Sequence, residues 1–215
     1  MVIAFVGVDG SGKTTLLSLF AKYLETKDKK VKIIKALRPE SVFLQNYNKI
    51  RNEFGLHYPK KKHEFNVIGS YIMSFDLLQQ SEAIKKLDSN DIVIILDRWA
   101  ICQQLYAKVW MAENDFINVA YRMCLEPDIT FVIDADMRLI EQRIQDRGGA
   151  NEYENILCLR RLKKMYQKYS SENENAILIR NNSKLDDAYA NIVQEYRKRK
   201  CMSYKNNTNI SKLKT

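Results

Sequence analysis

A glycine-rich loop between a short apolar run and an amphipathic stretch constrains the fold of this chain most strongly. The run VIAFV occupies residues 2–6, and GVDGSGKT follows at residues 7–14. Glycines in such a loop allow successive backbone N–H groups to turn towards a phosphate, and the helix that follows adds the positive end of its dipole. The pattern G-x-x-x-x-G-K-T, with a strand before it and a helix after it, predicts a loop that binds a nucleoside triphosphate.

The polar residues of this loop have distinct expected roles. Lys13 is expected to reach the terminal phosphates, and the hydroxyl of Thr14 is expected to bind Mg²⁺. The residues that we assign to the nucleotide are Gly7, Asp9, Gly10, Ser11, Gly12, Lys13, Thr14 and Thr15. Motors, GTPases and small-molecule kinases share such a loop, so it predicts a bound triphosphate but does not identify an acceptor.

Further apolar runs predict the rest of a sheet, at residues 31–37, 91–97, 128–134 and 175–180. The last three are continuous rather than alternating, which is typical of parallel strands covered by helices on both faces. The expected helices span residues 64–87, 99–123, 136–147, 152–171 and 184–198. We therefore expect an α/β fold of the P-loop NTPase type, a three-layer sandwich with a five-stranded, mostly parallel sheet flanked by helices.

The formal charge of +9 lies mostly at the C-terminal end of the chain. Residues 197–215 hold seven Lys and Arg and no acid, and subtracting these seven from +9 leaves +2 on residues 1–196. A near-neutral body favours an enzyme over a nucleic-acid-binding protein. We expect one folded domain over residues 1–198, a basic and disordered tail over residues 199–215, and no nucleic-acid partner.

Several absences narrow the functional class. No apolar stretch approaches the ~20 residues that a membrane span needs, and the first six residues do not form a signal peptide, so we expect a cytoplasmic protein with no membrane partner. The four cysteines show no C-x-x-C spacing, so we expect neither a metal cluster nor a disulfide framework. The sequence has no N-K-x-D string and no D-x-x-G after VIILD, which argues against a GTPase. A small-molecule kinase is the leading class.

The string IILDRW places two charged side chains at the end of a predicted strand, where ligands gather in parallel sheets. Asp97 would orient Mg²⁺ or its waters, and the guanidinium of Arg98 can bind two phosphate oxygens at once. An isolated Asp-Arg pair is more often a structural ion pair. The position of this pair beside the glycine-rich loop of residues 7–14, the phosphate loop, favours a role in catalysis.

Two arginines precede a pair of glycines later in the chain. Arg143 and Arg147 lie on a predicted helix that ends at Gly148-Gly149. A helix, a glycine hinge and a second helix predict a lid over about residues 143–155, with one arginine closing over the transferred phosphoryl group. Solvated side chains or local ion pairs are the alternative for both arginines.

Together these strings resemble the thymidylate kinase family, nucleoside monophosphate kinases that convert dTMP to dTDP. The matching strings are GVDGSGKTT, RPE, DRW, PDITFVID and RGG followed by EYEN, over about residues 1–198. The resemblance implies that ATP sits on the glycine-rich loop and that Asp9 faces the acceptor. It also implies that Arg38 and Arg98 hold the acceptor phosphate and that Tyr153 lies near the deoxyribose. As in the family, the helices over residues 64–87 and 99–123 would form the face of a homodimer, unless their apolar stripes serve the core of a monomer.

The sequence departs from the family pattern at several positions. Val6 stands where the family usually has a glutamate, and Leu37 stands where it has the arginine before the proline. Asn151 and Glu152 align with the Asp-Arg of the family's lid, so that role falls to Arg147 or Arg143. The helix that reads the base has Leu77 at the position of its arginine. The base would then be stacked by Phe75 or Tyr71 and hydrogen-bonded by Gln79 or Gln80, unless these aromatics are core residues.

Other functions remain open at this point. The acceptor can be an altered pyrimidine nucleotide in place of dTMP. A kinase for a nucleoside would need a carboxylate as base for a neutral hydroxyl, and Glu40 is the one candidate. A nucleotide-binding homologue with weak catalysis is a third possibility. The intact set of Lys13, Thr14, Asp97 and Arg98 favours the enzyme.

Overall fold

A five-stranded sheet forms the centre of the computed structural model, which describes the chain except for residues 37–40, 56–61, 88–91, 150–154, 183 and 213–215. All neighbouring strands are parallel, in the order β2-β3-β1-β4-β5. The strands are β1 (Val2–Val6), β2 (Lys30–Lys35), β3 (Ile92–Asp97), β4 (Ile129–Asp134) and β5 (Ala176–Arg180). The predicted five-stranded sheet of this fold class is confirmed.

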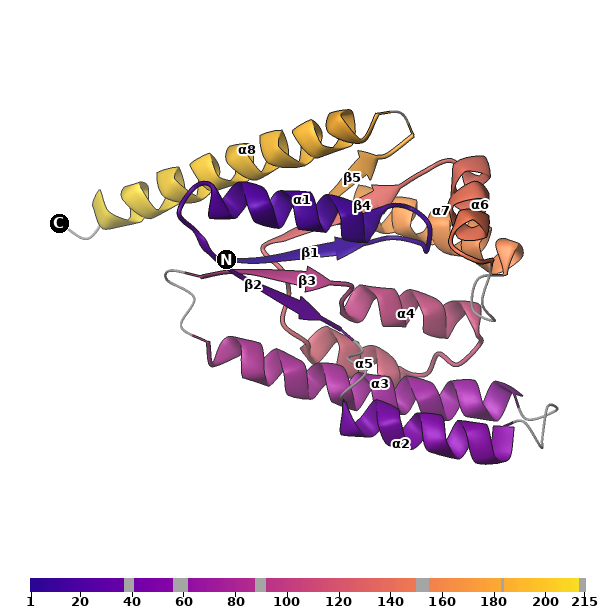
Figure 1. Ribbon diagram of the computed structural model, residues 1–215. Helices are drawn as coiled ribbons and strands as arrows, with labels where there is room; N and C mark the ends of the chain where they lie inside the picture. Colours follow the sequence, from indigo (N-terminus) through magenta and orange to yellow (C-terminus); the bar gives the residue numbers. More distant parts are fainter. Residues whose placement is uncertain (37–40, 56–61, 88–91, 150–154, 183, 213–215) are drawn as a thin grey trace.

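Helices cover both faces of this sheet. Those in the described residues are α1 (Lys13–Glu25), α2 (Val42–Ile50), α3 (Lys62–Lys85), α4 (Ala100–Val109), α5 (Asp115–Met123), α6 (Met137–Asp146), α7 (Ile156–Glu172) and α8 (Leu185–Lys212), with a π-helical turn at Arg51–Gly55. Figure 1 shows α1 and α8 on one face, α4 and α7 on the other, and α2, α3 and α5 as a group beside the β2 edge. This is the predicted three-layer sandwich.

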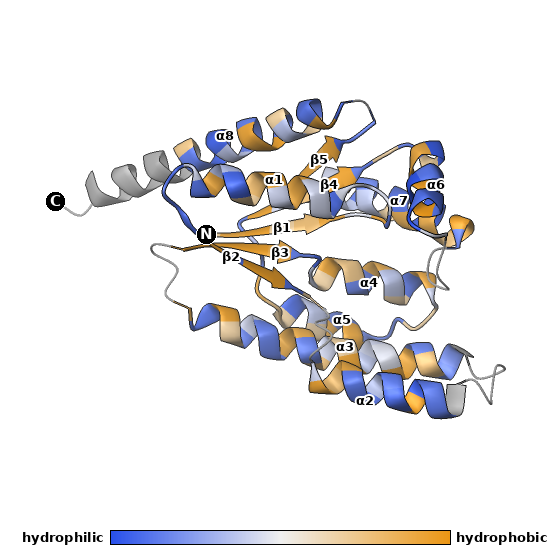
Figure 2. Ribbon diagram, in the orientation of Figure 1, coloured by the Kyte–Doolittle hydropathy of each residue, from blue (hydrophilic) through white to orange (hydrophobic). Residues whose placement is uncertain are grey.

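Alternate residues of β1 supply the two halves of the core. Ile3 and Phe5 pack with α1 and α8, whereas Ala4 packs with the helices on the opposite face. Phe20 of α1 lies 5.8 Å from Phe5 and 5.3 Å from Tyr196 of α8, measured between ring centroids. The central strands β1, β3 and β4 are mostly apolar in Figure 2, as expected when both faces of a parallel sheet are buried, whereas the edge strand β2 holds three lysines.

One expected helix, over residues 99–123, is two helices in the structure. The chain leaves α4 at Val109, and Met111 has a positive φ of 57°. The side chain of Asn114 then accepts a hydrogen bond from the backbone N–H of Ile117 and caps α5. Apolar periodicity continued across this break in the sequence, but the asparagine cap begins a new helix in a different direction.

The C-terminal helix also differs from the sequence prediction. The prediction ends this helix at residue 198, whereas α8 continues to Lys212. Residues 197–212 contain no glycine or proline that would stop a helix. Figure 1 shows the end of α8 projecting beyond the sheet. No helix within the described part of the chain is both long enough and apolar enough to cross a membrane.

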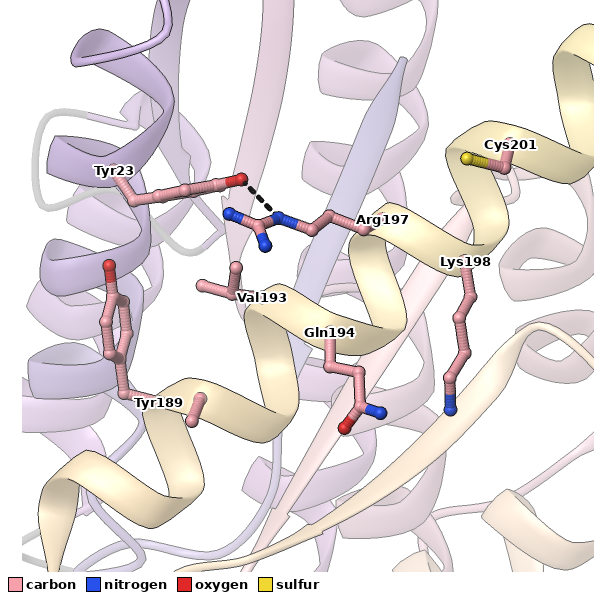
Figure 3. Close-up of a pocket in the computed structure, with 8 residues that line it drawn as sticks. Tyr23, Tyr189, Val193, Gln194, Arg197, Lys198 and Cys201 are labelled. Carbon is pink, nitrogen blue, oxygen red and sulfur yellow. Dashed lines mark hydrogen bonds between the residues drawn. The ribbon is translucent and has the colours of Figure 1, made fainter.

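A hydrogen-bonded pair joins α8 to α1 on the outer face of their layer. The Nε of Arg197 donates to the hydroxyl of Tyr23 at 3.0 Å, and the guanidinium lies 5.6 Å from the centre of the tyrosine ring. Figure 3 shows the pair at the edge of an open groove along α8, with Tyr189 and Val193 nearby. This contact fixes α8 against α1 beyond the end of the buried core.

Candidate active site

The phosphate loop turns where β1 meets α1. Gly7, Gly10 and Gly12 have φ values of 138°, 79° and 94°. Residues other than glycine rarely adopt such positive φ values. A Cβ on Gly7 would also come within 2.3 Å of the carbonyl oxygen of Ile133. Among the residues that the structure describes, no side chain caps the first turn of α1, so its N–H groups are open to an anion.

A cavity of about 590 Å³ lies beside this loop at the carboxyl edge of the sheet. Its lining comes from the loop, the ends of β2 and β3, helix α6, and the segment between β5 and α8. The lining residues are Asp9, Gly10, Gly12, Lys13, Thr14, Thr15, Lys35, Asp97, Arg98, Arg143, Arg147, Asn181 and Leu185. Most of the residues that the sequence assigned to the nucleotide and to catalysis therefore lie around one cavity.

Asp9 is the centre of a partly buried charge network in this cavity. Its carboxylate forms an ion pair with Arg98 and accepts a hydrogen bond from the hydroxyl of Tyr106 at 3.0 Å. Burial raises the pKa of Asp9, but the charges of Lys13 and Arg98 and the hydrogen bond from Tyr106 outweigh burial and lower its pKa below the usual value. Asp9 is therefore held ionised.

Arg98 is held in an unusual backbone conformation by its position at the end of β3. Its φ of 66° is rare for a residue with a side chain, and its backbone N–H donates to the carbonyl oxygen of Phe5 on β1. Burial lowers the pKa of Arg98, but the carboxylate of Asp9 outweighs burial and raises the pKa above its usual range. The guanidinium is therefore a fixed cation, and strain of this kind is typical of functional sites.

Lys13 is the second buried cation, with a side chain that is only 6% exposed. Its Nζ donates to the carbonyl oxygen of Val8 at 2.7 Å and lies 4.0 Å from Asp9. Burial, followed by the charge of Arg98, lowers the pKa of Lys13 to about 8. A bound phosphate would supply the negative charge that this site lacks, so the geometry suits an anionic ligand.

The two arginines of α6 are placed differently. Arg143 donates to the backbone carbonyl oxygens of Gly10 and Ser11, both at 3.2 Å, and of Asn181 at 3.3 Å. Arg147 follows the last turn of α6, lines the cavity, and contributes to the low pKa of Asp9 through its charge. Arg143 therefore braces the loop, while Arg147 lies nearer the charge network.

Two residues that the sequence assigned to the base are not part of the phosphate cavity. Phe75 and Gln79 are on an exposed face of α3 and do not line the phosphate cavity. The ring of Phe75 is 48% exposed and lies 5.8 Å from the ring of Phe116 on α5. Of the other assigned residues, Arg38 and Tyr153 lie outside the described part of the chain, and Gly7 and Ser11 belong to the loop without lining the cavity.

Sequence reasoning missed Lys35, Tyr106 and Asn181. Lys35 ends β2 beside Asp97, and Asn181 follows β5 directly. Both could have been found from the rule that ligand-binding residues collect after the carboxyl ends of parallel strands. Tyr106 lies two turns into α4 on its buried face, and only the tertiary structure brings its hydroxyl to Asp9.

Comparisons with known proteins agree with this geometry. The sequence profile of one family, described as thymidylate kinase, matches residues 5–192. A thymidylate kinase from Thermosipho africanus is 26% identical over 198 residues, covering 89% of this chain and 95% of that protein.

Two solved structures share the fold. The thymidylate kinase from Candida albicans superposes with a TM-score of 0.68 at 17% identity, covering 92% of both chains. A deoxyadenosine kinase from M. mycoides superposes with a TM-score of 0.65 at 18% identity, covering 92% of this chain and all of that one. On the strength of the profile match, the chain belongs to the thymidylate kinase family, and its activity is that of a nucleoside monophosphate kinase.

Proposed function

We propose that the protein transfers the γ-phosphoryl group of ATP to dTMP, giving dTDP and ADP. In this step a phosphate oxygen of dTMP bonds to the γ-phosphorus, and the bond between that phosphorus and the β–γ bridging oxygen breaks. The acceptor oxygen belongs to an ionised phosphate, so no general base is required. The observation that carries the proposal is the cavity beside the phosphate loop, which is lined by the cations Lys13, Arg98 and Arg147.

The main obstacle to this reaction is repulsion between two anions. Two unit charges about 4 Å apart repel by about 4 kcal/mol at an effective dielectric constant of 20. We assign Lys13 to the phosphates of ATP, because it follows the loop directly. We assign Arg98 to the acceptor phosphate, because its guanidinium can hold Asp9 with one nitrogen and still present further N–H donors.

Two oxygen-bearing side chains fit a magnesium ion at this site. The hydroxyl of Thr14 and the carboxylate of Asp97 both line the cavity, and Mg²⁺ prefers oxygen ligands supplied by one or two side chains together with phosphates and water. Bound Mg²⁺ would neutralise charge that develops on the transferred phosphoryl group. We therefore assign Thr14 and Asp97 to the Mg²⁺ of the nucleotide.

We assign the lid to about residues 143–155 within a kinase domain of residues 1–198. Arg147 stands at the end of α6, directly before Gly148 and Gly149, whose φ values are both positive. A hinge at these glycines would let the following segment close over the cavity. Because Arg147 lines the cavity and its charge acts on Asp9, it is the arginine that we assign to the transferred phosphoryl group.

The acceptor is tested by ADP release with Mg-ATP and a panel of nucleosides and nucleoside monophosphates. We expect turnover with dTMP and much less with thymidine, because the site holds cations for a phosphate. Turnover with nucleosides alone would replace the proposal with a nucleoside kinase. Turnover with another pyrimidine monophosphate in preference to dTMP would change the base, and no turnover with any acceptor would leave only nucleotide binding.

We also propose that the protein is a cytoplasmic homodimer. Phe75 of α3 and Phe116, Val119 and Met123 of α5 leave apolar surface exposed on neighbouring helices. A second copy of the chain would cover this surface. Light scattering at micromolar concentration should give twice the chain mass, and Val119→Asp should give one chain mass. A single-chain mass for the wild-type protein would contradict the dimer.

A further inference from the structure

The segment that follows β5 contacts the phosphate loop directly. Asn181, the first residue after β5, is 2% exposed, and its Nδ2 donates to the carbonyl oxygen of Ser11 at 2.8 Å. The same nitrogen lies 2.3 Å from the place that a Cβ on Gly12 would occupy. The amide of Asn181 is therefore packed against two consecutive residues of the loop, although it lies outside the glycine-rich pattern.

Arg143 approaches the same carbonyl from α6. Its Nη1 donates to the carbonyl oxygen of Ser11 at 3.2 Å, and its Nη2 donates to the backbone carbonyl oxygen of Asn181 at 3.3 Å. A carbonyl oxygen has two lone pairs, so Asn181 and Arg143 together use both acceptor positions of Ser11. The Ser11 carbonyl is thus held by two residues that lie 132 and 170 positions later in the sequence.

Holding this carbonyl also fixes a backbone donor. The carbonyl of Ser11 and the N–H of Gly12 belong to one peptide unit, which is planar and trans, so the two groups point in opposite directions. The Gly12 N–H is therefore turned away from the Asn181 side chain, and Gly12 itself lines the phosphate cavity. Such preset N–H groups are the donors that bind phosphate in a loop of this kind.

We infer that Asn181 is a positioning residue for ATP: it holds the Ser11 carbonyl so that the Gly12 N–H is oriented for a phosphate before the nucleotide arrives. This inference rests on the proposed binding of ATP to the phosphate loop. The segment between β5 and α8 would then contribute to the ATP site, although none of the sequence motifs includes it.

The burial of the amide argues against a purely structural role. The Oδ1 of Asn181 is buried and has no hydrogen-bond partner within the described ranges. A buried polar atom without a partner costs free energy, so a small apolar side chain would fill this position at lower cost. The gain from Asn181 lies in its Nδ2 donor, which acts on the phosphate loop.

Asn181→Ala tests the inference through two kinds of measurement. We expect the KM for ATP, and the Kd for ADP by calorimetry, to rise about fivefold, the effect of losing one hydrogen bond. The KM for dTMP should stay within twofold, and the melting temperature should stay unchanged because the unpaired Oδ1 is removed together with the bond. Unchanged ADP binding, with or without a lower melting temperature, would overturn the inference.

Asn181→Asp gives a second test with the shape of the side chain kept. A carboxylate oxygen would then face the Ser11 carbonyl and repel both it and the phosphates, so we expect the Kd for ADP to rise at least tenfold. ADP binding like that of the wild-type protein would overturn the inference.

Asn182→Ala is the matched control for both variants. Asn182 lies in the same segment, but its side chain accepts from the backbone N–H of Asp136 and is exposed. We expect ADP binding by this variant to equal that of the wild-type protein, and a rise equal to that of Asn181→Ala would overturn the inference. Calorimetry with ADP needs no turnover, so failure of the wild-type protein to phosphorylate dTMP would reject the proposed acceptor while this test still reports on Asn181.

Discussion

Two regions of the molecule differ in how far their sequence predicts the positions of their side chains. One is the phosphate side, which is the cavity beside the phosphate loop, and the other is the group of helices α2, α3 and α5. On the phosphate side, Asp9, Lys13 and Arg98 come from motifs, and all three line one cavity. On the helical side, Phe75 and Gln79 are predicted to meet the base, and they lie on an exposed face of α3 outside the phosphate cavity.

The buried polar residues of α3 are instead on a different face. Asp76 is fully buried and accepts hydrogen bonds from the hydroxyl of Ser41 at 2.6 Å and from Nε2 of Gln80 at 2.7 Å. A parallel sheet brings the carboxyl ends of all its strands to one edge, whatever the details of packing. A helix has no such constraint, because its inward face depends on the neighbouring helices that it meets.

Arg98→Ala should have the largest effect on this comparison. Loss of the guanidinium removes charge from the acceptor side and leaves Asp9 with Lys13, 4.0 Å away, as an ion-pair partner, so we expect kcat/KM to fall on the order of a hundredfold. Steady-state kinetics measure the fall, and circular dichroism checks that the variant is folded. Arg161→Ala, at an exposed arginine of α7, is the control. Near wild-type activity of Arg98→Ala would show that Arg98 and Asp9 form only a structural ion pair.

A change in pH should alter ATP binding about tenfold. The pKa of Lys13 is about 8 in the free protein, lowered by burial first and by Arg98 second. Because the charged form binds phosphate, the affinity for ATP should fall about tenfold from pH 7 to pH 9. Lys13→Arg keeps its charge over this range, so its affinity should change much less. An equally flat profile for the wild-type protein would contradict the role of Lys13.

Tyr106→Phe should have an intermediate effect. It removes the hydrogen bond to Asp9 and with it one of the contributions that lower the pKa of that carboxyl, so we expect kcat/KM to fall about fivefold. Tyr121→Phe is a matched control, because the hydroxyl of Tyr121 is buried without a partner among the described residues. Equal kinetics for the two variants would show that the network around Asp9 does not depend on Tyr106.

Phe75→Ala should have the smallest effect. The ring is half-exposed and faces Phe116 rather than the phosphate cavity, so we expect the KM for dTMP to stay within twofold. Phe116→Ala, which removes the other ring of the pair, should behave in the same way. A rise of fivefold or more for Phe75→Ala alone would restore the base-stacking role that the sequence suggested and remove the contrast between the two regions.

The outcome at the C-terminal end follows the same distinction between local and tertiary information. The sequence predicts that the last helix ends at residue 198, whereas α8 continues to Lys212. Composition describes whether a segment can bury apolar surface. It does not describe how far a helix continues once it is packed against the rest of the fold, as α8 is through Tyr196, Arg197 and Arg199.

The sequence by itself determined the sheet, the phosphate loop and the residues at the strand ends. These features depend on local rules, namely apolar runs that must be buried on both faces, glycines at positions of positive φ, and polar residues directly after a strand. The same rules placed Lys13, Thr14, Asp97 and Arg98 together before any contact was known.

The tertiary structure alone decided which partners complete the site. Tyr106 reaches Asp9 across 97 positions of the sequence, and Asn181 reaches Ser11 across 170. It also decided which face of α3 is buried and which arginine of α6 braces the loop. Contacts of this kind depend on the directions in which separate helices and strand ends meet, and no local pattern of residues encodes those directions.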